Sequence, residues 1–159
     1  MTFAPGDLPT PHLEVVMDLA VDVGAPIDVG QTSQGLRRLV PILGGSVSMG
    51  NIQGRVLAGG ADFQRIVGGE VAHLDARYCI ELDDGARIFV QNRALRVASA
   101  EDTAKLLRGE PVSPQSVYFR CQPQFETQSP TWQWLERLQF IGTGRRESTR
   151  VCMRMFAVR

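Results

Sequence analysis

Short segments in which apolar and polar residues alternate are the feature that most constrains the fold of this chain. In residues 71–82, one face of an extended strand would carry Leu74, Ala76, Tyr78, Ile80 and Leu82. Residues 12–23 and 151–158 alternate in the same way. Turns rich in glycine separate such segments by about 8–12 residues, a spacing typical of all-β proteins. The pattern predicts an antiparallel barrel or sandwich of about eight to ten strands.

Two other segments complete the expected architecture. Residues 99–107 predict one short helix, because Ser99 can cap its first turn and a glycine and a proline follow its end. Residues 132–138 are expected to start a further strand after a Ser-Pro turn. A length of 159 residues fits a single domain, in which the proline-rich residues 1–11 form an N-terminal arm.

Charge and hydropathy exclude several functions. The 17 basic and 17 acidic residues give a net charge of zero, so the chain lacks the positive field typical of nucleic-acid binding proteins. No run approaches the roughly 20 apolar residues of a membrane-spanning helix. The N-terminus has neither the basic flank nor the apolar core of a secretory signal. We therefore expect a cytoplasmic protein with no membrane or nucleic-acid partner.

The cysteines and histidines favour neither disulfides nor a metal site. Cys79, Cys121 and Cys152 are widely spaced and lie in apolar segments, so we expect buried free thiols. His12 and His73 lack a third ligand at a suitable spacing. The sequence indicates no metal and no other cofactor.

Two polar clusters between the predicted strands are candidates for a binding pocket. In the first, Asp62 and Gln64 follow a pair of glycines and either line a pocket or stabilise a turn. In the second, Asp75 and Arg77 share one face of a strand. They either form a salt bridge between strands or enter a cavity, where burial would perturb the pKa of Asp75 and fit it for general base catalysis. Tyr78, a further candidate ligand contact, points to the opposite face from Arg77.

Four residues on other segments complete the set of candidates. Arg38 and Arg120 could bind an anionic or enolic oxygen through their guanidinium groups, or pair structurally with a carboxylate. Glu126 is, with Asp62 and Asp75, a possible acid or base. Trp134 either stacks on a ligand or packs at the rim of the core.

Several motifs, in order along the chain, resemble one known family. They are Gly35-Leu36-Arg37-Arg38 with Val40-Pro41-Ile42, Gly59-Gly60-Ala61-Asp62-Phe63-Gln64, Leu74-Asp75-Ala76-Arg77-Tyr78, Tyr118-Phe119-Arg120, Phe125-Glu126-Thr127 and Gly142-Thr143-Gly144. The chain is similar over residues 12–158 to the bacterial and fungal family called domain of unknown function 3237, or uncharacterised protein family 0311. The resemblance implies a lipocalin-like barrel with a central cavity, and no particular reaction. Phe63 replaces the usual tryptophan and Glu136 a frequent asparagine, differences that affect ligand specificity more than fold.

Three functions fit these observations. The first is a barrel that binds a small oxygenated or anionic organic molecule. The second is a cofactor-independent isomerase, cyclase or lyase, in which Asp75, Asp62 or Glu126 is the base and Arg38 or Arg120 stabilises an oxyanion, with Gln64, Arg77, Tyr78 and Trp134 as further contacts. The third is a structural or oligomeric protein without a ligand. Barrel edges make a homodimer a reasonable expectation.

Overall fold

A computed structural model describes residues 2, 4 and 6–159. The predicted N-terminal arm over residues 1–11 therefore lies partly outside the described residues. The described part contains ten β-strands, which are β1 (Leu13–Val23), β2 (Ile27–Thr32), β3 (Gly35–Met49), β4 (Ile52–Val56), β5 (Ala61–Val67), β6 (Val71–Leu82), β7 (Arg87–Val97), β8 (Tyr118–Glu126), β9 (Gln139–Arg146) and β10 (Arg150–Val158). Its one α-helix is α1 (Ala100–Leu107), and two short 3-10 helices are η1 (Pro114–Ser116) and η2 (Gln133–Arg137).

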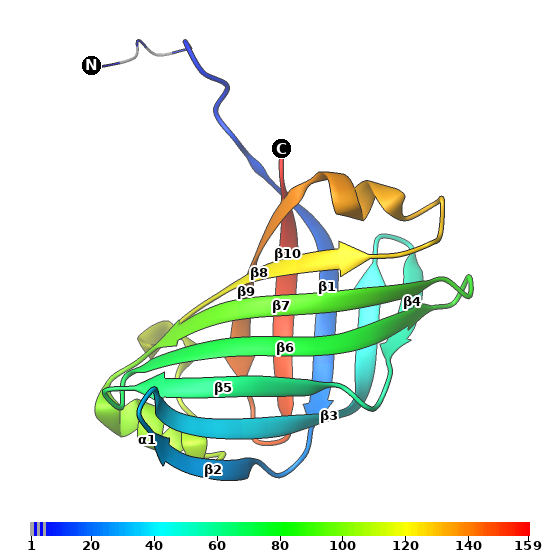
Figure 1. The fold of residues 1–159 in the computed structure, drawn as a ribbon. Coiled ribbons are helices and arrows are strands. Elements are labelled where there is room, and N and C mark those ends of the chain that lie inside the picture. Colours follow the sequence, from blue (N-terminus) through cyan, green and yellow to red (C-terminus); the bar gives the residue numbers. More distant parts are fainter. Residues whose placement is uncertain (1, 3, 5) are drawn as a thin grey trace.

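The strands form a closed antiparallel barrel (Figure 1). From β6 the sheet continues through β7, β8, β9 and β10 to β1, and β1 closes the ring by pairing with β3. Between β3 and β6, β5 pairs with one half of each strand and β4 with the other half. Strand β2 pairs with the first half of β3 and lies beyond the ring. The structure confirms the barrel, one of the two all-β architectures that the alternating segments predicted and the one that the family resemblance implied.

The length of β3 depends on a pair of glycines in its middle. Gly44 and Gly45 have φ angles of +153° and +141°, which residues with a side chain rarely adopt. A Cβ atom on Gly45 would also lie 3.0 Å from the Cα atom of Val21 in β1. The glycines therefore let a single strand serve two parts of the sheet. Before the glycine pair, β3 pairs with β2 and β5. From the glycine pair onward, it pairs mainly with β1 and β4.

Alternation along each strand places the core inside the barrel. In β6 the buried residues are Ala72, Leu74, Tyr78, Ile80 and Leu82, and in β8 they are Phe119, Cys121, Pro123 and Phe125. Burial of these apolar side chains is the main stabilising contribution to such a fold. Of the three cysteines, Cys121 is buried, whereas Cys79 and Cys152 are only half-buried, and all three are free thiols.

Helix α1 and helix η2 differ in how well the sequence predicted them. The Ser99 Oγ atom accepts a hydrogen bond of 3.1 Å from the Asp102 backbone N–H, which confirms the predicted cap. The strand predicted from residue 132 is wrong, because residues 133–137 form η2 and β9 begins only at Gln139. Leu135 explains the difference, since the helical turn buries its side chain to 1% exposure in the core.

Within the described residues, no helix has both the length and the apolar character that crossing a membrane requires. In the same part of the chain, no three His, Cys, Asp or Glu side chains come together as a metal site would need.

Candidate functional site

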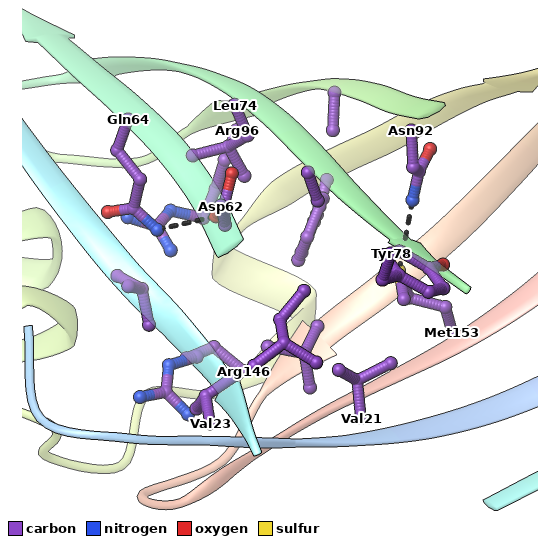
Figure 2. Close-up of a pocket in the computed structure, with 16 residues that line it drawn as sticks. Val21, Val23, Asp62, Gln64, Leu74, Tyr78, Asn92, Arg96, Arg146 and Met153 are labelled. Atoms are coloured by element: carbon purple, nitrogen blue, oxygen red, sulfur yellow. Dashed lines mark hydrogen bonds between the residues drawn. The ribbon is translucent and has the colours of Figure 1, made fainter. Parts of the chain in front are cut away.

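The candidate site is an internal chamber and the vestibule beside it. The inner chamber has a volume of about 50 Å³ and is lined by Val21, Val23, Val40, Ile42, Asp62, Gln64, Leu74, Ala76, Tyr78, Asn92, Ala94, Arg96, Phe119, Arg146, Val151 and Met153 (Figure 2). The vestibule has a volume of about 240 Å³ and lies between the barrel, residues 23–26, the end of α1 and the turn at residues 148–149. Val23, Val40, Gln64, Arg96 and Arg146 line both compartments, so these residues mark the boundary between them.

Strand register brings the polar residues of the site together. Arg38 of β3 lies opposite Gln64 of β5, and Asp62 of β5 lies opposite Ala76 of β6. Ala76 is in turn opposite Asn92 of β7. Because inward side chains recur at every second residue, Asp62 and Gln64 both face the barrel interior, as do Asn92 and Arg96.

Asp62 is a carboxylate inside the barrel with one free oxygen. Gly60 allows this placement, because a Cβ atom there would lie 2.7 Å from the Cβ atom of Tyr78 in β6. The Gln64 Nε2 atom donates a hydrogen bond of 2.7 Å to Asp62 Oδ2, whereas Asp62 Oδ1 is buried without a partner among the described residues. Burial raises the pKa of Asp62, although the Gln64 amide and the charge of Arg96 oppose this effect.

Arg96 is a buried cation at the boundary of the inner chamber. Its side chain is 5% exposed and, among the residues that the structure describes, has neither a hydrogen-bond nor an ion-pair partner. Desolvation lowers the pKa of Arg96 to about 10, Asp62 opposes the decrease, and the charges of Arg146 and Arg38 add to it. At neutral pH the guanidinium group is still charged.

Two further arginines surround the same boundary. Arg146, at the end of β9, donates hydrogen bonds to the backbone carbonyls of Glu147 and Arg150, the latter at 3.1 Å. Burial and the charge of Arg38 lower the pKa of Arg146. Arg38 itself lines the vestibule, where its Nε atom donates to Asp28 at 2.7 Å and its terminal nitrogen donates to the Leu107 carbonyl of α1 at 3.1 Å.

Tyr78 and Asn92 lie near Met153, away from the arginines (Figure 2). The Tyr78 hydroxyl and the Asn92 side-chain carbonyl oxygen are fully buried and have no partner among the described residues. Burial raises the pKa of Tyr78 well above its ordinary value, so the hydroxyl keeps its proton. The Asn92 Nδ2 atom donates to the Met153 sulfur at 3.3 Å. This end of the chamber therefore presents the Tyr78 ring rather than its hydroxyl oxygen.

Asp75 and Arg77, which the sequence placed either in a cavity or in a salt bridge between strands, lie on the outer face of β6. Arg77 donates to Asp75 at 3.2 Å, and Gln91 of β7 donates to Asp75 at 3.1 Å. Partial burial alone would raise the pKa of Asp75, but these two hydrogen bonds outweigh it and lower the pKa. The cavity placement is corrected, because Tyr78 occupies the inner face and adjacent residues point to opposite faces.

The remaining candidates also lie away from the chamber. Arg120 is exposed on β8, with its guanidinium carbon 4.9 Å from the centre of the Tyr118 ring, and Glu126 is exposed at the end of the same strand. Both alternate with buried residues of β8, which explains their outward direction. Trp134 belongs to η2 and packs against Phe140, with 6.1 Å between the ring centres.

Of the predicted site residues, the structure brings together Asp62, Gln64 and Tyr78 at the inner chamber and Arg38 at the vestibule. Sequence reasoning missed Asn92, Arg96 and Arg146. Asn92 and Arg96 were detectable in principle, because they share a strand face with Ile88 and Val90. Arg146 has no such signal, since it stands where β9 meets a polar turn.

These observations define a class of protein, a closed antiparallel β-barrel whose internal chamber opens past buried arginines. Residues 11–158 match the family described as "Protein of unknown function (DUF3237)", and the chain belongs to that family. It is 43% identical over 143 residues to a UPF0311 protein of Rhodopseudomonas palustris, covering 90% of this chain and 94% of that protein. A UPF0311 protein of Bradyrhizobium diazoefficiens is 39% identical over 143 residues, 90% of this chain and 93% of its own length.

Solved structures show the same barrel. A conserved protein of unknown function from Rhodopseudomonas palustris superposes with a TM-score of 0.90 at 39% identity, over 96% of this chain and 100% of the other. A β-barrel-like protein from Acinetobacter baumannii has a TM-score of 0.84 at 35% identity, and the match covers 97% of this chain and 99% of the other. A structure described as an enzyme from Penicillium herquei is similar in fold, with a TM-score of 0.71 at 21% identity. This match covers 97% of this chain and 99% of the other. The family resemblance seen in the sequence motifs is confirmed.

Proposed function

We propose that this protein binds a small organic anion inside the barrel, with the negative group between Arg96 and Arg146. The observation that carries the proposal is the guanidinium group of Arg96, which is charged and buried without a partner in the described part of the chain. A buried charge is destabilising when it is only partly compensated, as that of Arg96 is by the charge of Asp62. A bound anion would supply both the missing hydrogen bonds and the opposite charge.

The charge around the boundary favours an anion over a cation. The charge of Arg38 lowers the pKa of both Arg96 and Arg146, and the charge of Arg146 also lowers the pKa of Arg96. Among the described residues, Asp62 is the one carboxylate lining the inner chamber, and burial disfavours its charged form. Arginine forks match carboxylate oxygens in geometry, so a carboxylate or an enolate is the expected group.

Titration with butyrate and its neutral isostere butyramide tests the proposal, with Met153 and valine methyl signals followed by NMR. Butyrate is expected to bind more tightly than butyramide. Arg96→Gln should weaken butyrate binding about tenfold or more, since a hydrogen bond to a charged group contributes roughly 1.5–3 kcal/mol. Arg93→Gln is the matched control, because Arg93 is exposed on the other face of β7. Equal binding of butyrate and butyramide, or no binding of either, would contradict the proposal.

A second candidate function is acid–base catalysis in the same chamber. Asp62 favours it, because this buried carboxyl group has a raised pKa and its Oδ1 atom has no hydrogen-bond partner among the described residues. A bound oxo acid would then lose a proton from the carbon beside its carbonyl group, and the arginines would stabilise the resulting enolate.

Proton exchange distinguishes catalysis from binding alone. In deuterated water, the C3 protons of 2-oxobutyrate should exchange faster with the protein than without it, as measured by NMR. Asp62→Asn should remove the acceleration, while Asp75→Asn on the outer face should keep it. If binding occurs without accelerated exchange, the barrel is a binding protein for this ligand. If no ligand of either kind binds, the third function, a structural protein whose polar groups only join strands, is favoured.

A further inference from the structure

The polarity of the lining increases from the inner chamber to the vestibule. The walls of the inner chamber are mainly apolar and include Val21, Val40, Ile42, Leu74, Phe119 and Met153. The oxygens of Tyr78 and Asn92 at its far end are buried, so they add little polar surface to it. The vestibule has apolar residues such as Pro26, Leu106 and Leu107 on one side, but it adds Arg38, Ser148 and Thr149 to the Arg96 and Arg146 that it shares with the inner chamber.

From this asymmetry, and resting on the proposed function, we infer that the ligand is an amphipathic monoanion that binds with its apolar end first. Its carboxylate lies at the boundary against Arg96 and Arg146, and its apolar end fills the inner chamber beside the Tyr78 ring. The chemical class is therefore a short aliphatic or small cyclic carboxylic acid, not a polyanion such as a nucleotide.

The opposite orientation is unfavourable for two reasons. A carboxylate at the far end of the inner chamber, beside the Tyr78 ring and Met153, would face mainly apolar walls, which replace few of the hydrogen bonds that it makes with water. It would also approach Asp62, which lines the inner chamber but not the vestibule. Two carboxyl groups in one site oppose each other's ionisation, so the second negative charge would raise the free energy of the complex.

The volume of the inner chamber limits the apolar end. Its 50 Å³ corresponds to about three to five water-sized positions, since a single water needs roughly 10–15 Å³ by this measure. An apolar end of about three to five carbon atoms would fill the space. Ala76 of β6 and Ala94 of β7 keep the chamber open, because both are small inward residues on otherwise bulky strands.

The test is the affinity of the full-length protein for straight-chain carboxylates from acetate to octanoate, measured by calorimetry or NMR titration. Burial of one methylene group contributes about fourfold in affinity. We expect this gain for each carbon up to butyrate, pentanoate or hexanoate, and no further gain for heptanoate and octanoate. Affinity that is the same at every chain length would overturn the inference while leaving the proposed anion site standing. Affinity that rises through octanoate would also overturn it, because the chain would then lie outside the chamber.

A variant that fills the chamber gives an independent check. Ala94→Leu should reduce the gain per carbon to less than about twofold, because the added side chain occupies the space of the ligand's apolar end. Ala100→Leu is the matched control, since Ala100 is exposed at the start of α1 and should keep the wild-type gain. If Ala94→Leu does not fold, as judged by thermal unfolding without ligand, Ala94→Val serves with a smaller expected reduction. An unchanged gain per carbon in a folded Ala94 variant would contradict the inference. If no carboxylate binds the wild type, the proposed function itself fails.

Discussion

Burial inside the barrel makes Asp62 harder to ionise in the folded protein than in the unfolded chain. The ordinary pKa of the group is 3.8, and desolvation raises it in the folded state. Between the two pKa values, the folded protein holds a proton that the unfolded chain has released. The free energy of unfolding of the wild type therefore contains a contribution that falls as the pH rises above about 4.

Asp62→Asn removes this titration and gives a prediction. The free energy of unfolding of the variant minus that of the wild type should increase from about pH 4 upward, by at most about 1.4 kcal/mol per pH unit, and then level off. Urea denaturation of both proteins at a series of pH values measures the difference. Asp75→Asn is the control and should show no such increase, because hydrogen bonds lower the pKa of Asp75 instead. A difference that decreases with pH would contradict the burial of Asp62 described here.

For single residues of the site, the sequence predicted the alternation of faces but not always which face lines the interior. The alternation of β6 placed Tyr78 on the opposite face from Arg77 without deciding which of the two faces inward, and the structure shows Tyr78 inside. The sequence of β7 is less informative, because Phe89 and Leu95 are exposed while Asn92 and Arg96 are buried. Hydrophobicity alone would orient part of this strand wrongly. The face that Arg96 shares with Ile88 and Val90 indicates its inward direction, and the register between β6 and β7 shows it.

At the level of elements, Arg38 joins three parts of the fold. Its backbone is in β3, its Nε atom binds Asp28 of β2 and its terminal nitrogen binds the last carbonyl of α1. A cation is favourable at the C-terminal end of a helix, where backbone carbonyls lack partners within the helix. Arg38 therefore holds α1 against the rim of the vestibule.

Arg38→Gln is expected to lower the free energy of unfolding by about 1–3 kcal/mol, since it removes two hydrogen bonds made by a buried charged group. Hydrogen exchange of the backbone amides at the end of α1 should accelerate more than exchange in β7. Arg37→Gln is the matched control, because Arg37 is the neighbouring residue and is exposed. Equal exchange in the two variants would show that Arg38 does not hold the helix.

The elements themselves were predicted better than the site, because strand alternation and helix caps are local properties. The cap at Ser99 needs only its own turn, and it is where the sequence indicated. The sequence did not predict η2, because this helical turn forms where Leu135 fills a space in the core, and that space is made by residues far away in the sequence. No pattern within residues 132–138 indicates that this space exists.

At the scale of the whole molecule, a row of apolar residues on the outer surface supports the proposal that the protein forms a homodimer. Ile27 of β2, Leu39 of β3 and Phe63 of β5 lie side by side in neighbouring strands, and Ile27 and Phe63 are 57% and 45% exposed. A second copy could cover this apolar row by packing against it.

We therefore expect Phe63→Glu to shift the protein from dimer to monomer, because a charge in the middle of an apolar interface is strongly unfavourable. Sedimentation velocity at several concentrations measures the shift. Phe89→Glu is the control, since Phe89 is also exposed but lies on β7, away from the row. A wild-type protein that sediments as a monomer at all concentrations would contradict the proposal.

The pairing of β1 with β10 has a consequence for how the protein is made. Leu13 pairs with Val158 and Asp22 with Arg150, so the first and last strands must meet before the ring can close. Contacts of such large sequence separation slow folding. Val151 and Met153 of β10 also line the inner chamber. During synthesis the chamber therefore does not exist until β10 has left the ribosome, and the unclosed sheet exposes its edge strands to chaperones and to other chains in the interval.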